Sequence, residues 1–436
     1  MFISRLSLLF LAFMFAASNI YAQERAQVFT GATLITVTGD EIENGVMVIQ
    51  NGKIVAVGPQ GQVRIPRRSD EIDVSGKIIM PGIVDTHSHI GRGDGGDRSS
   101  AMHPDTRILD AINPQSDTFK KARAGGITTV NVMPGSGHLI SGQTVYLKPR
   151  WGRTIYDLMI EDDRLQGVTG GIKFANGTNS IRANPPFPGT RAKSTSLVRQ
   201  LLVRAQEYQQ RIIDADGDPE KMPARNIELE PLVEVLEGRR IVHFHTHTHY
   251  DIMTAIRLSQ EFNFRVVLHH VSEGWKVADE IAAAGVPASI IALDTPGGKL
   301  EAVNLLYKVG KALEDAGVDF AYHTDDGVTD SRLFLRMAAL GMRAGLSREK
   351  ALESLTIAGA RMMDLDHRVG SLEAGKDADF VILDGDPFSV YTRILETWID
   401  GEKVFDRSDP EHLKFYTGGE GVFQDILHSH YGHGHD

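Results

Sequence analysis

Short apolar runs alternate with helical stretches through the middle of the chain, from about Gly82 to Met363. Continuous apolar runs are typical of strands that are buried on both faces, as in a parallel sheet. The runs predicted to form strands are residues 83–85, 127–132, 145–147, 170–175, 240–244, 264–268, 288–293 and 318–322. Eight strand–helix units in about 280 residues match a (β/α)8 barrel, which needs about 250 residues. We therefore predict an α/β protein with a TIM-like barrel over residues 81–365.

The helices predicted between the strands cover residues 197–211, 252–261, 277–284 and 300–315, and another begins after Ser347 and ends near Met363. Both ends of the chain carry a different, strand-rich pattern with hairpin signals. The dipeptide Asn51-Gly52 separates two apolar runs near the N-terminus, and Asp400-Gly401 does the same near the C-terminus. We predict that residues 23–80 and 366–410 form one small β-sandwich.

The first 22 residues resemble a secretory signal. Arg5 provides the positive start, residues 6–17 are apolar, and Ala22 is a suitable cleavage point. The alternative interpretation is an uncleaved membrane anchor. The chain has no cysteine, which excludes a lipoprotein anchor, disulfides, thiolate metal sites and cysteine nucleophiles. We expect a periplasmic or secreted protein with no stable membrane insertion after the signal is removed.

The net charge and the histidine content indicate which kinds of partner the protein can bind. The chain has 46 basic and 57 acidic residues, a net charge of −11, which argues against nucleic acid as a partner. Seventeen histidines without cysteine indicate metal binding through nitrogen and oxygen. Part of the histidine lies in a C-terminal tail, residues 411–436, which we interpret as a disordered terminus or a metal-capturing segment.

Candidate ligands follow the predicted strands, and the strand ends of a barrel converge on one mouth. His87 and His89 lie two positions apart, so both side chains point the same way, about 6–7 Å apart along the strand. Lys173 ends a buried strand, where its charge must be removed or paired. Carbamylation of Lys173 would create a carboxylate that bridges two metals; the alternative is a solvated lysine.

Three further strand ends carry histidine or aspartate. Of the four histidines in residues 243–249, we assign His245 to the strand end, and we interpret His247 and His249 as polar loop residues, with substrate contact as the alternative. Adjacent residues of a strand face opposite ways, so only one of His269 and His270 is expected to point inward. We choose His270, with His269 as a structural histidine. Asp325 is the predicted catalytic carboxylate and Asp326 the alternative.

With these residues in view, the chain resembles the amidohydrolase superfamily, and most closely its imidazolonepropionase-like and prolidase-like branch. The similar segments are residues 81–89, 126–130, 324–325 and 370–380, together with His245 and His270. The resemblance implies a distorted barrel, a flanking β-sandwich and one or two divalent metals. A related group has Lys-x-Ala-x-Gly-Glu-Asn where this chain has residues 173–179, with Thr178 in place of the glutamate. Lys173 is therefore the candidate for the bridging ligand.

We expect these candidate residues to act as metal ligands, as a proton carrier and as a residue that orients a ligand. His87, His89 and carbamylated Lys173 would hold one metal, and His245, His270 and the same carbamate a second; zinc suits these ligands best. Asp325 would bind the first metal, take a proton from the metal-activated hydroxide nucleophile and pass it to the departing amine. Asp85 would orient a ligand histidine.

The predicted function is hydrolysis of a small-molecule amide, of the dipeptide or N-acyl amino acid type. The alternatives are a cyclic-amide hydrolase similar to imidazolonepropionase, a deaminase, and a non-catalytic periplasmic metal-binding protein. Related deaminases carry a glutamate a few residues after the fifth-strand histidine, and residues 246–251 contain none. Loops 184–190 and 296–299 are expected to select the substrate. The sequence leaves the choice between a monomer and a homo-oligomer open.

Overall fold

The computed structural model describes residues 25–91, 93, 96–292, 299–419 and 422. The predicted signal segment, residues 1–22, and the tail histidines at positions 428–435 lie outside the described residues, and so do residues 296–298 of one predicted substrate loop. Within the described ranges, no helix is long and apolar enough to cross a membrane.

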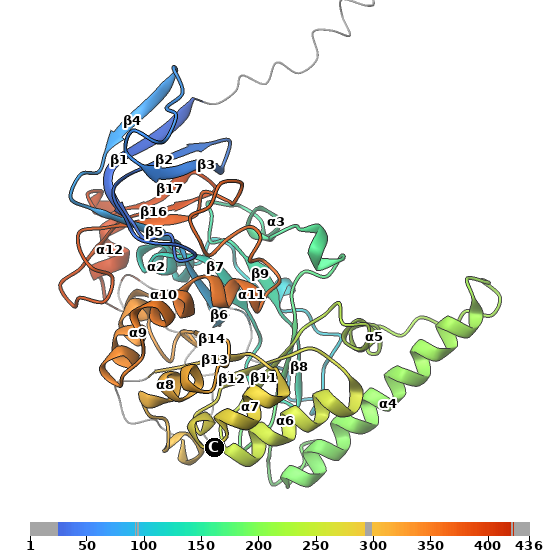
Figure 1. Cartoon of the computed structure of the whole chain (residues 1–436). Coiled ribbons are helices and arrows are strands. Elements are labelled where there is room, and N and C mark those ends of the chain that lie inside the picture. Colours follow the sequence, from blue (N-terminus) through green and yellow to red (C-terminus); the bar gives the residue numbers. More distant parts are fainter. Residues whose placement is uncertain (1–24, 92, 94–95, 293–298, 420–421, 423–436) are drawn as a thin grey trace, which may run out of the picture.

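Strands from both ends of the chain share one eight-stranded sheet, which lies at one end of the molecule in Figure 1. The two ends meet where β5 pairs antiparallel with β15, with Pro81 opposite Phe380. Asn51 and Gly52 both have positive φ, as do Asp400 and Gly401, which is the geometry that a two-residue hairpin turn requires. The strands are β1 Ala26–Leu34, β2 Ile42–Gln50, β3 Lys53–Pro59, β4 Ser69–Asp73, β5 Ile78–Pro81, β15 Phe380–Leu383, β16 Ile394–Ile399 and β17 Glu402–Asp406.

The middle of the chain forms two further sheets, whose strands are mostly parallel. One has the order β14-β13-β12-β11-β10-β8 and the other the order β6-β7-β9. Strands β6, β7, β10, β11 and β12 are buried along their whole length, as their continuous apolar patterns predict. The strands are β6 Ile83–Ser88, β7 Ile127–Val132, β8 Ile140–Gln143, β9 Val145–Leu147, β10 Ile172–Ala175, β11 Val242–Thr246, β12 Val266–His270, β13 Ala288–Ile290 and β14 Phe320–Tyr322.

The regular alternation of strand and helix breaks at the third predicted unit. Strand β9, expected as a parallel member of the series, pairs antiparallel with β7, and the short strand β8 pairs antiparallel with β10. Only Thr144 separates the end of β8 from the start of β9, so no crossover helix fits between them. The backbone of Asp326 bridges to Ser88 in parallel register, which brings the end of β14 beside the end of β6.

Helices surround the parallel strands, and α4 is the longest of those described (Figure 1). Two helix predictions need correction. Residues 300–315 form a 3-10 turn and then α8, and the helix predicted after Ser347 is divided at Thr356, whose φ of −136° and ψ of −97° are not helical. The helices and 3-10 turns are η1 Ile108–Asp110, α2 Asp117–Ala124, α3 Ile155–Leu158, η2 Asp163–Leu165, α4 Arg191–Ala215, α5 Glu230–Leu236, α6 His249–Phe262, η3 Gly274–Lys276, α7 Ala278–Ala284, η4 Leu300–Ala302, α8 Lys308–Asp315, η5 Ser331–Leu333, α9 Phe334–Arg343, α10 Arg348–Leu355, α11 Ile357–Arg361 and α12 Pro410–Thr417.

Candidate metal centre

His87 and His89 point from the end of β6 toward a common centre. Their Nε2 atoms lie 3.3 Å apart. The Nδ1 atom of His89 lies 2.8 Å from the carbonyl oxygen of Met133 and donates to it, so Nε2 of His89 carries the free lone pair. Burial lowers the pKa of His87 well below its usual value, which keeps this imidazole neutral. Both rings can therefore act as metal ligands through Nε2.

Lys173 and Asp325 reach the same centre from β10 and from the turn after β14. Nζ of Lys173 lies 3.0 Å from Nε2 of His87, and the side chain is completely buried. Burial lowers the pKa of Lys173 to about 7, so a large share of this amine is neutral at physiological pH. Oδ1 of Asp325 lies 3.3 Å from Nε2 of His87 and 3.0 Å from Nε2 of His89.

The carboxyl group of Asp325 is ionised in this setting. Burial acts against its charge, but the interactions with His89, His323 and Lys173 outweigh burial and hold the pKa of Asp325 well below the usual range. The alternative residue, Asp326, faces elsewhere: it pairs with Lys121 at 2.8 Å and accepts a hydrogen bond from the backbone of Ser331. The geometry thus brings Asp325, and not Asp326, to the histidines.

His245 and His270 form a second group beside the first, with ring centroids 4.4 Å apart. His270 has a φ of +70°, so the regular alternation of side chains ends at this residue. As a result both His269 and His270 face the interior and both lie beside His87, with centroid distances of 5.0 and 4.9 Å. The expectation that only one of the two adjacent histidines points inward is therefore wrong.

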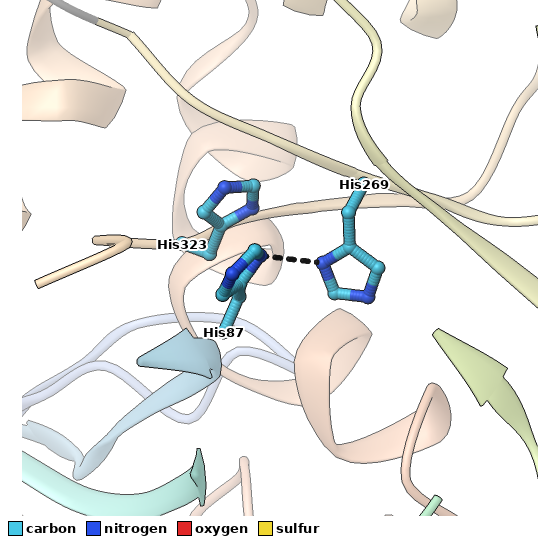
Figure 2. Close-up of side chains that lie close together, drawn as sticks. All are labelled: His87, His269 and His323. Carbon is cyan, nitrogen blue, oxygen red and sulfur yellow. Dashed lines mark hydrogen bonds between the residues drawn. The ribbon is translucent and has the colours of Figure 1, made fainter. Parts of the chain in front are cut away.

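A chain of hydrogen-bonded rings lies beneath His87. Nδ1 of His87 lies 3.2 Å from Nδ1 of His269, whose Nε2 lies 2.9 Å from Nδ1 of His243. Nε2 of His243 in turn lies 3.0 Å from Oη of Tyr146. Figure 2 shows the bond between His87 and His269, with the ring of His323 stacked on that of His87. Both nitrogens of His269 are paired, which agrees with a structural role that orients His87.

Two histidines that the sequence did not assign to the centre lie in it. His323 lies 2.7 Å from Oγ of Ser289 through Nδ1 and 3.2 Å from Nδ1 of His270 through Nε2. His247 is buried and stacks on His270 at 4.8 Å, so it is not a solvated loop residue. Its i+2 spacing from His245 was the available signal. His249, by contrast, is half exposed and pairs with Glu273.

Asp85 acts on the backbone and not on a histidine ring. Its Oδ1 accepts hydrogen bonds from the backbone nitrogens of His87 and Thr324, and its Oδ2 accepts one from Oγ1 of Thr324. Burial, as the main cause, raises the pKa of Asp85 to about 7. Asp85 therefore ties β6 to the segment that carries Asp325, and it holds the predicted ligand His87 through its backbone and not through its ring.

The rim of the centre contains Asn179 and Lys299. Nδ2 of Asn179 lies 3.3 Å from Nε2 of His245. Lys299 is half buried, and burial lowers the pKa of its ammonium group. Among the described residues, no group forms a hydrogen bond or ion pair with Lys299. Burial first, and then the charge of Lys299, lowers the pKa of His247 to about 3, so the cation lies close to the centre.

The donor set fits divalent metal ions. Ligand atoms of His87, His270 and Asp325 lie within 4.8 Å of one another, as do those of His245, His247 and His270. Nδ1 of His245 and Nε2 of His247 are buried and have no hydrogen-bond partner among the described residues. Neutral imidazole nitrogens and carboxylate oxygens are the ligands that zinc and related ions take in proteins. Thr178, at the position of the related group's glutamate, brings no carboxylate to this centre.

Comparison with known proteins agrees with this geometry. Residues 177–405 match the family described as "Amidohydrolase family". The amidohydrolase tasK of Hapsidospora irregularis is 27% identical over 394 residues; the match covers 83% of this chain but 40% of the relative, so the chain spans less than half of that protein. The imidazolonepropionase of Caulobacter vibrioides is 25% identical, over 79% of this chain and 88% of the relative.

The solved structure of an amidohydrolase from Thermotoga maritima superposes with a TM-score of 0.81 at 30% identity. The match covers 87% of this chain and all of that one. The family match over more than half of the chain and this relative lead to the same assignment, which the sequence predicted. The chain belongs to the amidohydrolase family, and it is a hydrolase that acts on carbon–nitrogen bonds.

Proposed function

We propose that this protein is an exported, metal-dependent amidohydrolase that cleaves the amide bond of a dipeptide or an N-acyl amino acid. The observation that carries the proposal is the meeting of four donor groups from three strand ends. His87, His89, Lys173 and Asp325 bring their donor atoms together at separations of 3.0–3.3 Å between contacting pairs. Family membership disfavours the alternative of a non-catalytic metal-binding protein.

We also propose how the strands form a barrel and a sandwich, and that the protein is exported. Strands β6, β7 and β10–β14, together with β8, which pairs with β10, would form one distorted (β/α)8 barrel, closed where Asp326 bridges to Ser88. The sheet built from both chain ends would be the flanking β-sandwich. Export rests on the composition of residues 1–22, because an apolar stretch of this length after a basic residue is typical of a signal peptide.

The side chains at the centre would have separate roles in binding metal and in moving a proton. When bound, a divalent ion such as zinc lowers the pKa of water and polarises a carbonyl oxygen. His87, His89 and Asp325 would hold one ion, His245 and His270 a second, and Lys173, neutral enough to react with carbon dioxide, would bridge them as a carbamate. Asp325, ionised at neutral pH, accepts the proton of the attacking water and delivers it to the departing amine nitrogen.

Lys299 supports a substrate with a free carboxylate. Its half-buried ammonium forms no hydrogen bond or ion pair with a described residue, although the charges of Asp325 and Glu301 act on it, so an anionic group of the substrate would be a suitable direct partner. Dipeptides and N-acyl amino acids carry such a carboxylate on the amine side of the scissile bond. A hydrogen bond to a charged group contributes about 1.5–3 kcal/mol, which corresponds to about 10–100-fold in binding.

The test combines metal analysis of the purified protein with a hydrolysis screen of dipeptides and N-acyl amino acids, each also supplied as its C-terminal amide. We expect bound divalent metal, and a KM for the free acids that rises about 10–100-fold in Lys299→Met while kcat and the KM for the amides stay the same. Metal-loaded protein that cleaves no compound of the screen contradicts the proposed substrate class.

A cyclic-amide hydrolase is the second candidate, because the match with imidazolonepropionase covers 79% of this chain. Imidazolone propionate also carries a carboxylate, so Lys299 is compatible with both substrates. Adding this compound to the same screen separates the two candidates. Turnover of the cyclic amide with kcat/KM well above that of every linear amide would select the second one.

A further inference from the structure

His247 occupies an unusual place for a residue that follows a strand. It comes directly after β11, yet it is 7% exposed and packs inside the histidine group. Its ring lies 4.6 Å from that of His245 and is stacked on that of His270 at an interplanar angle of 15°. Three imidazoles from two neighbouring strand ends therefore face one small volume.

The hydrogen bonds of His247 leave one nitrogen free. Nδ1 lies 2.7 Å from Oγ of Ser272, a completely buried hydroxyl. Nε2 is buried and has no partner among the described residues, and the same is true of Nδ1 of His245. A buried nitrogen without a hydrogen bond costs free energy unless another group, such as a cation, interacts with its lone pair. Two such nitrogens on rings whose centroids lie 4.6 Å apart indicate a shared ligand.

We propose that His245, His247 and His270 form a three-imidazole site that binds a divalent cation without the carbamate of Lys173. One ligand nitrogen of each ring lies within 4.8 Å of the other two. Three histidines and an open fourth position are a known ligand set for zinc. The inference rests on the proposed metal-dependent function and adds His247 to its ligands.

Ser272 orients the ring of His247. If Nε2 of His247 binds the cation, Nδ1 carries the hydrogen and donates it to Oγ of Ser272. Partners of this kind fix the ring and its tautomer, and their removal typically lowers metal affinity about 10–100-fold. The consequence is that this ion keeps three histidine ligands when the carbamate of Lys173 is absent, whereas the ion at His87 and His89 loses one of its ligands.

The experiment measures zinc affinity by competition with a chromophoric chelator, and zinc content by mass spectrometry, on the full mature chain. Lys173→Met removes the carbamate and keeps the volume of the buried side chain. We expect this variant to retain one tightly bound zinc ion. Adding His247→Gln should lower the zinc affinity further. We expect a larger decrease than the about 10–100-fold that is typical when a ligand loses its hydrogen-bond partner. Adding Ser272→Ala should weaken it by about 10–100-fold.

The control is His249→Gln in the same Lys173→Met protein, because His249 lies two positions further on and pairs with Glu273 outside the group. We expect its zinc affinity to match that of Lys173→Met, and circular dichroism of the metal-free proteins verifies that all variants are folded. Equal affinity in the His247→Gln and His249→Gln proteins would overturn the inference and leave the proposed function intact. Absence of bound metal from the unaltered protein would overturn both.

Discussion

Asp325 stands between the two groups of imidazoles. One carboxylate oxygen lies within 3.3 Å of Nε2 of both His87 and His89, and the other lies 3.9 Å from Nδ1 of His270. The residue has a φ of +50°, and its backbone nitrogen donates to the carbonyl oxygen of His87. Its side chain is thus held by the backbone of β6 as well as by the neighbouring rings, which is the preorganisation that proton transfer requires.

The first prediction concerns this carboxylate. Asp325→Asn keeps the size of the side chain but removes the group that accepts and returns the proton, so we expect kcat to fall by about 10²–10⁴-fold while bound metal is retained. Steady-state kinetics and metal analysis of the same preparation check both parts. Turnover equal to that of the unaltered protein would exclude Asp325 as the proton carrier.

The sequence predicts the identity of most residues in the centre but not the side on which each lies. His87, His89, Lys173, His245 and Asp325 follow from their positions at strand ends, because parallel strands end together. The positive φ of His270 is a tertiary effect without a glycine or asparagine to signal it, so the inward position of His269 was missed. The burial of His247 was missed because this residue lies beyond the end of β11, although its i+2 spacing from His245 is consistent with the same face.

At the scale of elements, Glu273 connects the loop after β12 with the start of α6. Thr248, the residue before this helix, makes no side-chain capping bond. Glu273 takes over that role: its Oε2 accepts hydrogen bonds from the backbone nitrogen and Nδ1 of His249. A carboxylate at a helix N-terminus is also stabilised by the helix dipole. The link ties the start of α6 to the loop after β12, and a backbone hydrogen bond from Glu273 to the carbonyl oxygen of His247 holds the segment with His247 against the segment with Ser272.

The second prediction is the pH dependence of this link. Burial acts to raise the pKa of Glu273, but hydrogen bonds from Lys276, His249 and Asn304 outweigh it and lower the pKa to about 2. A carboxyl group with a lowered pKa stabilises the fold above its unfolded value near 4.5, and this contribution disappears as the pH falls toward 2. A lowering of this size corresponds to about 3 kcal/mol at most.

Urea unfolding of the unaltered protein and of Glu273→Gln at several pH values measures this contribution. We expect the variant to be less stable by about 1–3 kcal/mol at pH 7, with the difference shrinking steadily between pH 5 and pH 3. A difference that stays constant over that interval would mean that the ionised carboxylate is not the source of the stability.

Some helices and strands can be predicted from the local sequence pattern, and others cannot. The buried strands and both hairpins follow from continuous apolar runs and from Asn-Gly and Asp-Gly turns, which are local signals. The antiparallel pairing of β9 with β7 depends on contacts between distant segments, and a three-residue strand carries no periodicity. The division of α10 from α11 lies at Thr356, whose hydroxyl donates back to the carbonyl oxygen of Leu352, a local competitor of the helix.

At the scale of the whole molecule, the sheet formed by the two chain ends is fixed to the central strands through a buried cation. Lys148 follows β9 and is completely buried. Its Nζ lies 2.7 Å from Asp377, 2.9 Å from Asp379 and 2.5 Å from Asp400, which all belong to the C-terminal part of the sheet region. Burial is the main cause that raises the pKa of Asp379 to about 6, and the charge of Lys148 opposes this rise.

The third prediction follows from this arrangement. Lys148→Met keeps the length of the side chain and removes its charge. Lys53 and Arg368 still pair with Asp377, and Arg150 still pairs with Asp400, so Asp379 is the carboxyl group that is left without a counter-ion among the described residues. Removal of one partner from a buried ion pair costs about 3–5 kcal/mol. The pKa of Asp379 should rise further, so this group would be protonated at low pH and carry a buried, unpaired charge at high pH. We therefore expect a larger loss of unfolding free energy at pH 8 than at pH 5.

Urea unfolding at the two pH values tests this expectation, with Lys414→Met as the control, because Lys414 forms an exposed ion pair with Glu411 on α12. Exposed pairs contribute about 0–1 kcal/mol, so the control should unfold almost as the unaltered protein does at both pH values. If Lys148→Met behaved like the control, the cation would not hold the two parts together. A loss of unfolding free energy that is larger at high pH would instead show that one buried charge holds the sheet of the two chain ends to the central strands.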